Sequence, residues 1–280
     1  MIDEAELRAF SFGEIQFEVT PRDAILYGLG VGLGNDPTDT NQLRYVYESA
    51  LEAFPTMPVV LGSPGMWFAK AGLDWRKIVH GAQSLTNYRP VPIGVPLVAA
   101  SRVAAIYDRG AERGAVVEVD RNIATADGTP VATTVSTYIC RGDGGFGGTV
   151  PEPVDDWAAP DRAPDAVVTL PTLPQQALIY RLSGDINPLH ADPAAAAKAG
   201  FDRPILHGLC TYGLMARGVL DSFGGRLAEI SGRLSRPLFP GETLKLCAWR
   251  DADSVLFEAS VPARQTRVFA AGRARLEDAE

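Results

Sequence analysis

The sequence has few cysteines, few histidines and no long apolar run, and each shortage excludes a class of protein. The three cysteines form no Cys-x-x-Cys pair, so they predict buried, reduced thiols of a cytoplasmic protein and not a zinc site. No apolar run reaches the roughly 18 residues that a membrane-spanning helix needs. Acidic residues outnumber basic ones by 34 to 26, which disfavours nucleic acid as the main ligand. We therefore expect a cytoplasmic protein that binds neither membranes nor nucleic acid.

A glycine-rich stretch at 142–148 is followed by an acidic, proline-containing stretch that ends near Pro164. Such a composition cannot build a core and is typical of a linker. We therefore predict an N-terminal domain at 1–145, a linker at 146–164 and a C-terminal domain at 165–280.

Both halves combine apolar helices with alternating strands, which predicts an α+β fold with antiparallel sheets. In the second half, the apolar positions predict a buried helix at 208–223. Strands are expected there at 166–170, 243–249, 255–261 and 266–274. In the first half we expect a helix at 24–31 and strands at 97–107, 115–120 and 131–140.

Segments 89–97 and 236–244 share Arg, Pro, Gly and Leu at matching positions, and both precede a long strand, which indicates a duplication. The His-Gly pairs at 80–81 and 207–208 lie at different distances from these segments and are therefore not equivalent. We expect no long helix after the first pair, which would leave a slot for an elongated apolar ligand. The small residues Gly65 and Ala69 are expected near this slot.

Asp185, Asn187 and His190 stand in a polar turn, where Pro188 disfavours helix for the residue before it. A carboxylate and an imidazole in one loop are suited to acid–base catalysis near neutral pH. Gly208 opens the buried helix, whose free N–H groups could polarise a carbonyl oxygen. The alternative interpretation is a structural turn with a helix cap.

The sequence gives weaker signals for a metal site and for a dinucleotide-binding site. Asp185, His190 and His207 could ligate a metal, but the helix start at His207 makes this the less favoured interpretation. The glycines at 28–34 lack dinucleotide-binding spacing and indicate a helix exit or close packing. We therefore predict neither a metal nor a cofactor.

The stretches 184–190 and 204–211 resemble the hydratase 2 motif of the MaoC-like dehydratases. This family comprises the R-specific 2-enoyl-CoA hydratases, including the hydratase domain of peroxisomal multifunctional enzyme type 2. The first His-Gly pair and the glycine-rich linker are also similar to its two-domain members. The resemblance implies a double hotdog fold, with two antiparallel sheets each wrapped around a helix in a pseudo-dimeric chain. It also implies a catalytic C-terminal half and an N-terminal half that makes room for the acyl chain.

The resemblance also implies residue roles. Asp185 and His190 would be the catalytic pair, Asn187 would orient the water, and the N–H of Gly208 would hold the thioester oxygen. The remaining residues would contact the substrate or its CoA: His80, Gly81, Arg109, Ile186, Pro188, Leu189 and Leu234. Arg109 would meet a CoA phosphate, and Leu234 replaces a phenylalanine of a relative.

The expected activity is the reversible hydration of trans-2-enoyl-CoA to (3R)-3-hydroxyacyl-CoA by syn addition of water, in a homodimer. Two alternatives stay open. One is a hotdog acyl-CoA thioesterase, in which an aspartate activates water against the thioester carbonyl. The other is a non-catalytic acyl-CoA-binding subunit.

Overall fold

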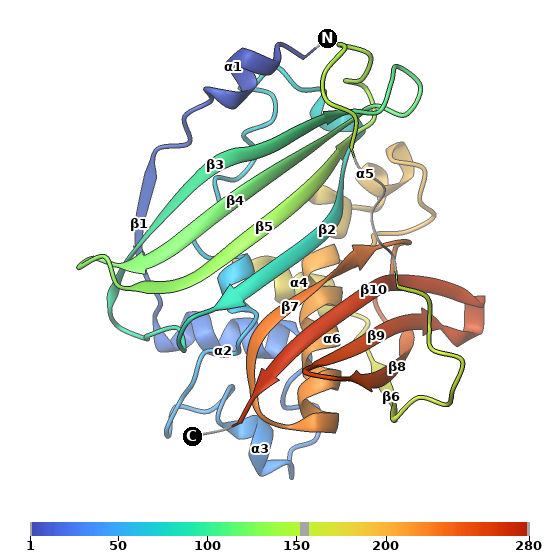
Figure 1. Cartoon of the computed structure of the whole chain (residues 1–280). Helices are drawn as coiled ribbons and strands as arrows, with labels where there is room; N and C mark the ends of the chain where they lie inside the picture. Colours follow the sequence, from blue (N-terminus) through green and yellow to red (C-terminus); the bar gives the residue numbers. More distant parts are fainter. Residues whose placement is uncertain (1, 152–156, 279–280) are drawn as a thin grey trace.

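The computed structural model describes residues 2–151 and 157–278, so residues 152–156 of the predicted linker lie outside the described residues. Ten strands form one antiparallel sheet in the order β1-β3-β4-β5-β2-β7-β10-β9-β8-β6 (Figure 1). The strands of the first half are β1 (Glu14–Glu18), β2 (Ile78–Asn87), β3 (Pro96–Asp108), β4 (Ala115–Thr125) and β5 (Pro130–Cys140). Those of the second are β6 (Ala166–Pro171), β7 (Arg226–Leu234), β8 (Thr243–Asp251), β9 (Ser254–Val261) and β10 (Thr266–Glu277).

The strand order reads as the same five-stranded unit twice, with β2 and β7 meeting in the middle. These two strands pair in register from Ala82 opposite Arg233 to Thr86 opposite Glu229. Each unit places its first strand at an outer edge and its second strand at the shared centre. The predicted α+β class and the duplication are confirmed, although the two expected sheets are joined into one.

Six helices accompany the described strands: α1 (Glu4–Arg8), α2 (Pro21–Gly30), α3 (Thr40–Leu43), α4 (Gln176–Tyr180), α5 (Pro193–Lys198) and α6 (Gly208–Phe223). The α6 helix is buried from Cys210 to Val219, as its apolar sequence predicts. It packs against β6, β7, β8 and β10 and fills the concave side of the second unit (Figure 1). Within the described chain, no helix is long and apolar enough to cross a membrane.

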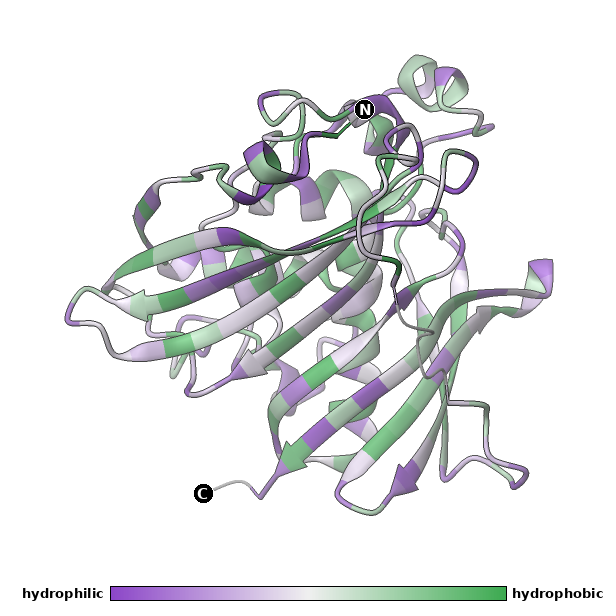
Figure 2. Ribbon diagram, turned by 45° about the horizontal axis from the view of Figure 1, so that its top comes forward, coloured by the Kyte–Doolittle hydropathy of each residue, from purple (hydrophilic) through white to green (hydrophobic). Residues whose placement is uncertain are grey.

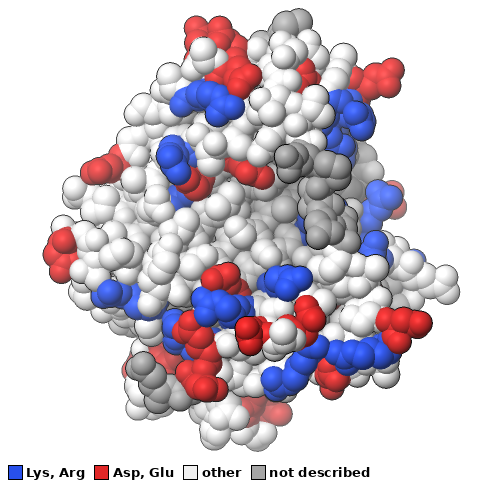
Figure 3. All heavy atoms as spheres, viewed as in Figure 1, with Lys and Arg blue, Asp and Glu red and all other residues white. Residues whose placement is uncertain are grey.

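The strands alternate between hydrophobic and hydrophilic residues, so one face of the sheet is buried and the other is polar (Figure 2). On the outer face of the second unit, charges of both signs gather (Figure 3). Arg275 lies 2.8 Å from Glu229, and Arg267 lies 3.1 Å from Glu258. The interior therefore lies on the opposite, concave side of the sheet.

The first unit differs from the second in what covers its concave side. Its helix α2 holds the same place in the chain order as α6, but it has 10 residues against 16. Its His-Gly pair lies within β2 and no helix follows it directly, which confirms that the two His-Gly pairs are not equivalent. The segment between α2 and β2 supplies buried side chains instead, namely Phe54, Met57, Val59, Trp67 and Phe68.

Some expectations about single residues are wrong. Gly65 and Ala69 are exposed and do not line the interior, because the segment that carries them turns its larger neighbours Trp67 and Phe68 inward. Cys247 is half-buried, whereas Cys140 and Cys210 are buried. Close packing is confirmed for the first glycine of the stretch 28–34, since a Cβ added at Gly28 would lie 2.7 Å from the backbone oxygen of Tyr45.

Candidate active site

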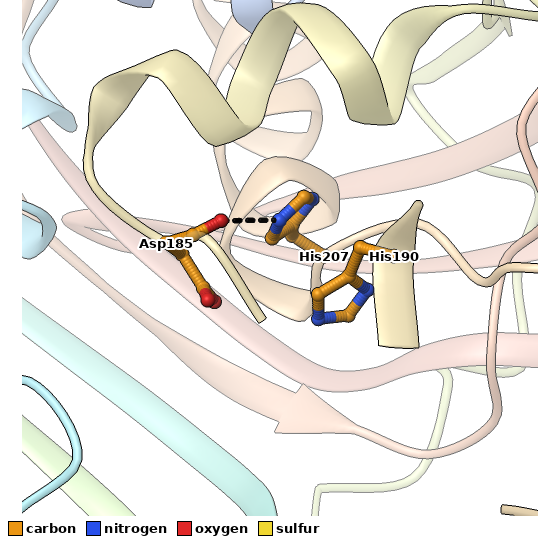
Figure 4. A group of neighbouring side chains, drawn as sticks. All are labelled: Asp185, His190 and His207. Atoms are coloured by element: carbon orange, nitrogen blue, oxygen red, sulfur yellow. Dashed lines mark hydrogen bonds between the residues drawn. The ribbon is translucent and has the colours of Figure 1, made fainter. Parts of the chain in front are cut away.

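Asp185, His190 and His207 converge between α4 and the start of α6 (Figure 4). One nitrogen or oxygen atom from each lies within 4.8 Å of the others. The two histidine rings are stacked, with centroids 3.8 Å apart and planes 28° apart. The structure thus brings together the predicted catalytic pair and a second histidine.

His190 is held in one orientation by the backbone. It ends the short 3₁₀ turn Pro188–His190, and its Nδ1–H donates to the carbonyl of Ile205 at 2.8 Å. This tautomer leaves a lone pair on Nε2. Burial lowers the pKa of His190 below its usual value, so the ring is neutral at neutral pH and can accept a proton.

His207 ties the loop to the helix. The residue is 1% exposed, and its Nε2–H donates to the backbone carbonyl of Asp185 at 3.1 Å. Burial, with a smaller contribution from His190, lowers the pKa of His207 to about 3. The residue is also the N-cap of α6. From the sequence, the only role predicted for His207 is the less favoured one of metal ligand. Its contact with Asp185 is not predicted, because the two residues are far apart in the chain.

The loop that carries Asp185 is folded by its own side chains. Oδ1 of Asp185 accepts from the N–H of Asn187 at 3.1 Å, and Oδ1 of Asn187 accepts from the N–H of Leu189 at 3.0 Å. Arg181 donates to the carbonyl of Ile186 at 2.9 Å. The structural turn considered from the sequence is therefore present, and it also presents the exposed Asp185 carboxylate beside His190.

Gly208 is the first residue of α6. The N-cap His207 gives no side-chain hydrogen bond to the first turn, so the N–H groups there keep their positive potential. A Cβ added at Gly208 would lie 2.5 Å from Cδ1 of Leu234, at the end of β7. The structure thus brings Gly208 and Leu234 together, as two of the residues predicted for the site.

The first unit contributes His80 from β2. Its Nε2–H donates to the carbonyl of Ala82 at 3.0 Å, across a β-bulge at Gly81. A Cβ added at Gly81 would lie 2.9 Å from Cδ1 of Ile139. Burial lowers the pKa of His80 to about 4, while the charge of Asp185 acts in the opposite direction. The pairing of β2 with β7 places His80 near the site, because Ala82 lies opposite Arg233, the residue before Leu234.

The other predicted contact residues are scattered. Ile186 is 73% exposed, Pro188 is exposed and Leu189 is half-buried, all on the Asp185 loop. Arg109 lies in the turn between β3 and β4, where its N–H donates to Gly114 at 2.9 Å. None of the hydrogen bonds that it forms with the described residues involves the Asp185 loop. Its expected role toward a CoA phosphate stays a prediction.

Asp185, His190 and His207 also have the spacing of a metal site, since one ligand atom from each lies within 4.8 Å of the others. Each histidine gives one ring N–H to a backbone carbonyl, which is common for metal-bound histidines as well as for acid–base histidines. The less favoured metal-binding interpretation stays a prediction.

Comparisons with known proteins agree with this topology. Residues 17–142 match the MFE-2 hydratase 2 N-terminal domain, and residues 156–270 match the MaoC like domain. An enoyl-CoA hydratase of Mycobacterium tuberculosis is 37% identical over 92% of this chain and 93% of its own.

Two solved structures are also similar. A MaoC-like dehydratase from Phytophthora capsici superposes with a TM-score of 0.86 at 31% identity, covering 100% of both chains. The peroxisomal multifunctional enzyme type 2 of Drosophila melanogaster superposes with a TM-score of 0.80 at 34% identity, covering 94% of this chain and 48% of its own. The fold is a double hotdog. The chain belongs to the MaoC-like family, in its two-domain hydratase 2 form.

We predict that the protein becomes less stable as the pH is lowered, because of its three buried histidines. His80, His190 and His207 are the only histidines of the sequence, and all have lowered pKa values. An unfolded histidine titrates near pH 6.5, so below this pH the unfolded chain binds protons that the folded chain does not. The free energy of unfolding should therefore decrease from about pH 6.5 to pH 4, by up to about 1.4 kcal/mol per pH unit for each histidine.

Urea unfolding across this pH range measures the effect. The matched control is His207→Phe, which keeps a stacked ring and removes one titrating group, so its slope should be shallower. An equal slope in both proteins would show that His207 does not titrate as the buried site requires.

Proposed function

We propose that the protein catalyses the reversible hydration of trans-2-enoyl-CoA to (3R)-3-hydroxyacyl-CoA. The observation that carries this proposal is the placement of Asp185 and His190 side by side, next to the uncapped start of α6. The pair can hold one water, and the helix start can hold a thioester oxygen. The similarity to a protein named enoyl-CoA hydratase supports the same reaction.

The chemistry needs only the chain's own residues. The Asp185 carboxylate and Nε2 of neutral His190 accept hydrogen bonds from the water. As the water oxygen bonds to the β carbon, the pair takes one proton from it and returns that proton to the α carbon. The pair thereby ends in its starting protonation state. Because the hydroxyl and the proton come from one site, both add to the same face of the double bond.

Charge develops on the thioester oxygen during this step. The N–H of Gly208 and the dipole of α6 would stabilise it, since the helix start is fixed before the substrate arrives. His207 would be a positioning residue, because it contacts the carbonyl of Asp185, stacks on His190 and precedes Gly208 in the chain. Asn187 would hold the loop in shape.

The remaining assignments are also proposals. His80, Gly81, Ile186, Pro188, Leu189 and Leu234 would contact the substrate, and Arg109 the CoA phosphates. The N-terminal domain at 1–145 would accommodate the acyl chain, and the C-terminal domain at 165–280, beyond a linker at 146–164, would carry the chemistry. We also propose that the protein is cytoplasmic and forms a homodimer, and a measurement of mass in solution tests the homodimer.

Asp185→Asn and His190→Ala should each lower the hydration rate by about 100-fold or more, as expected for a positioned acid–base group. The assay follows loss of the enoyl-thioester absorbance of crotonyl-CoA, with chiral analysis of the product. Circular dichroism checks that both variants fold.

The same assay separates the alternatives. A thioesterase would release free thiol, and a binding subunit would bind crotonyl-CoA without turnover. Near-normal hydration in either variant would contradict the assigned pair, and a (3S) product would contradict the proposed reaction.

Gly208→Ala should lower kcat more than it weakens CoA binding, because its Cβ would clash with Leu234 and displace the N–H that holds the oxygen. The matched control is the double variant Gly208→Ala with Leu234→Ala, in which the clash is gone. It should recover a large part of the lost kcat, relative to Leu234→Ala alone. A change in KM alone would argue for uniform binding instead.

A further inference from the structure

The concave face of the first unit carries a buried polar row. Four neighbouring side chains form it: Gln83 on β2, Arg121 on β4, and Thr134 and Ser136 on β5. Their exposed fractions are 2%, 6%, 1% and 8%. The equivalent strands of the second unit, β9 and β10, bury apolar residues such as Val255, Phe257, Val268 and Phe269. The same fold unit can therefore close with an apolar interior.

The row separates two apolar clusters. On one side lie Leu85, Leu97, Ala99, Ile123 and Ala132, which belong to the main core. On the other lie Val103, Val117, Val119 and Cys140, packed with Trp67 and Phe68. We expected an apolar slot in this unit, and its interior is instead crossed by hydrogen-bonding groups.

Arg121 is the unusual member of the row. Its Nη2 donates to the carbonyls of Pro58 and Val59, at 3.3 and 2.7 Å, but its Nε is buried without any hydrogen-bond partner. Among the described residues, no carboxylate forms an ion pair with it. A buried cation without a counter-charge is costly and needs an explanation.

Thr134, directly opposite Arg121 in the β4–β5 register, has the same deficit. Its Oγ1 is buried and has no partner. Ser136 and Gln83 lie one step closer to the active site. The hydroxyl of Ser136 donates a hydrogen bond to Oε1 of Gln83 at 2.8 Å. The unsatisfied groups are therefore confined to the Arg121 end of the row.

The row leads away from the catalytic cluster. Tyr138 follows Ser136 on the same face of β5, and its ring contacts His80 with centroids 5.1 Å apart. His80 in turn lies two residues before Ala82, which pairs with Arg233 beside Leu234 at the candidate site. From Tyr138 to Thr134 is four residues along β5 at about 3.3 Å each, or roughly 13 Å. An acyl group that extends inward from the reacting carbons along this face would bring its far end to Arg121.

We infer that the acyl group of the substrate carries an oxygen function at its far end, and that Arg121 and Thr134 bind this oxygen. The inference rests on the proposed hydratase function. A carboxylate is the ligand that best fits, because it would accept hydrogen bonds from both residues and neutralise the buried cation. A carbonyl or hydroxyl would satisfy the hydrogen bonds alone.

The test compares trans-2-enoyl-CoA substrates of equal chain length that end in a methyl, a hydroxyl or a carboxylate group. The readout is the ratio of kcat/KM between an oxygenated and a methyl-ended substrate, which cancels any general loss of activity. In the wild-type protein this ratio should exceed one and be largest for the carboxylate. Arg121→Met should lower it by about tenfold or more, as expected for a hydrogen bond to a charged group.

Thr134→Val is a second, nearly isosteric variant that should lower the ratio without removing the contacts of Arg121 to Pro58 and Val59. The matched control is Arg102→Met, at an arginine whose side chain is 74% exposed and pairs with Asp120. Its ratio should equal that of the wild type.

A wild-type preference for the methyl-ended substrate, or a ratio unchanged in both Arg121→Met and Thr134→Val, would overturn the inference. Failure of the proposed function looks different, since the wild-type protein would then hydrate none of the substrates, crotonyl-CoA included.

Discussion

The site depends on two stacked, desolvated imidazoles whose protonated nitrogens are each fixed on a backbone carbonyl. The Nδ1–H of His190 donates to Ile205, and the Nε2–H of His207 donates to Asp185. Burial lowers the pKa of both rings, so each remains neutral and keeps a defined lone pair. Protonation of His190 would place a proton on Nε2 and remove the acceptor that the proposed water requires.

The duplicated fold gives this cluster its surroundings. The second unit keeps a long buried helix, whose first residue, Gly208, is proposed to hold the thioester oxygen. The first unit has a shorter helix, and the chain between α2 and β2 covers its concave face instead. In the proposed mechanism the second copy holds the chemistry, and the first copy shapes the space beyond the reacting carbons. The polar row at Arg121 shows that this space is not a simple apolar tunnel.

Sequence predicts the local features of this protein well. The Asp185 loop and α6 follow from turn residues, helix spacing and a proline, all within one stretch of chain. The strands β2 and β7 are not predicted, because glycine and polar residues interrupt their alternation and their pairing joins distant segments. The roles of His207 and Arg121 also depend on distant contacts. A buried arginine in a strand gives no local sign of where its side chain lies.

Hydration of crotonyl-CoA in D₂O tests the central claim most directly, since Asp185 and His190 are proposed to handle a single water on one face of the substrate. The product's relative configuration at the α and β carbons is read from its proton NMR couplings. The account predicts a (3R) product with deuterium and the hydroxyl added to the same face, as a single diastereomer. Addition to opposite faces, or a mixture of diastereomers formed at the initial rate, would contradict it.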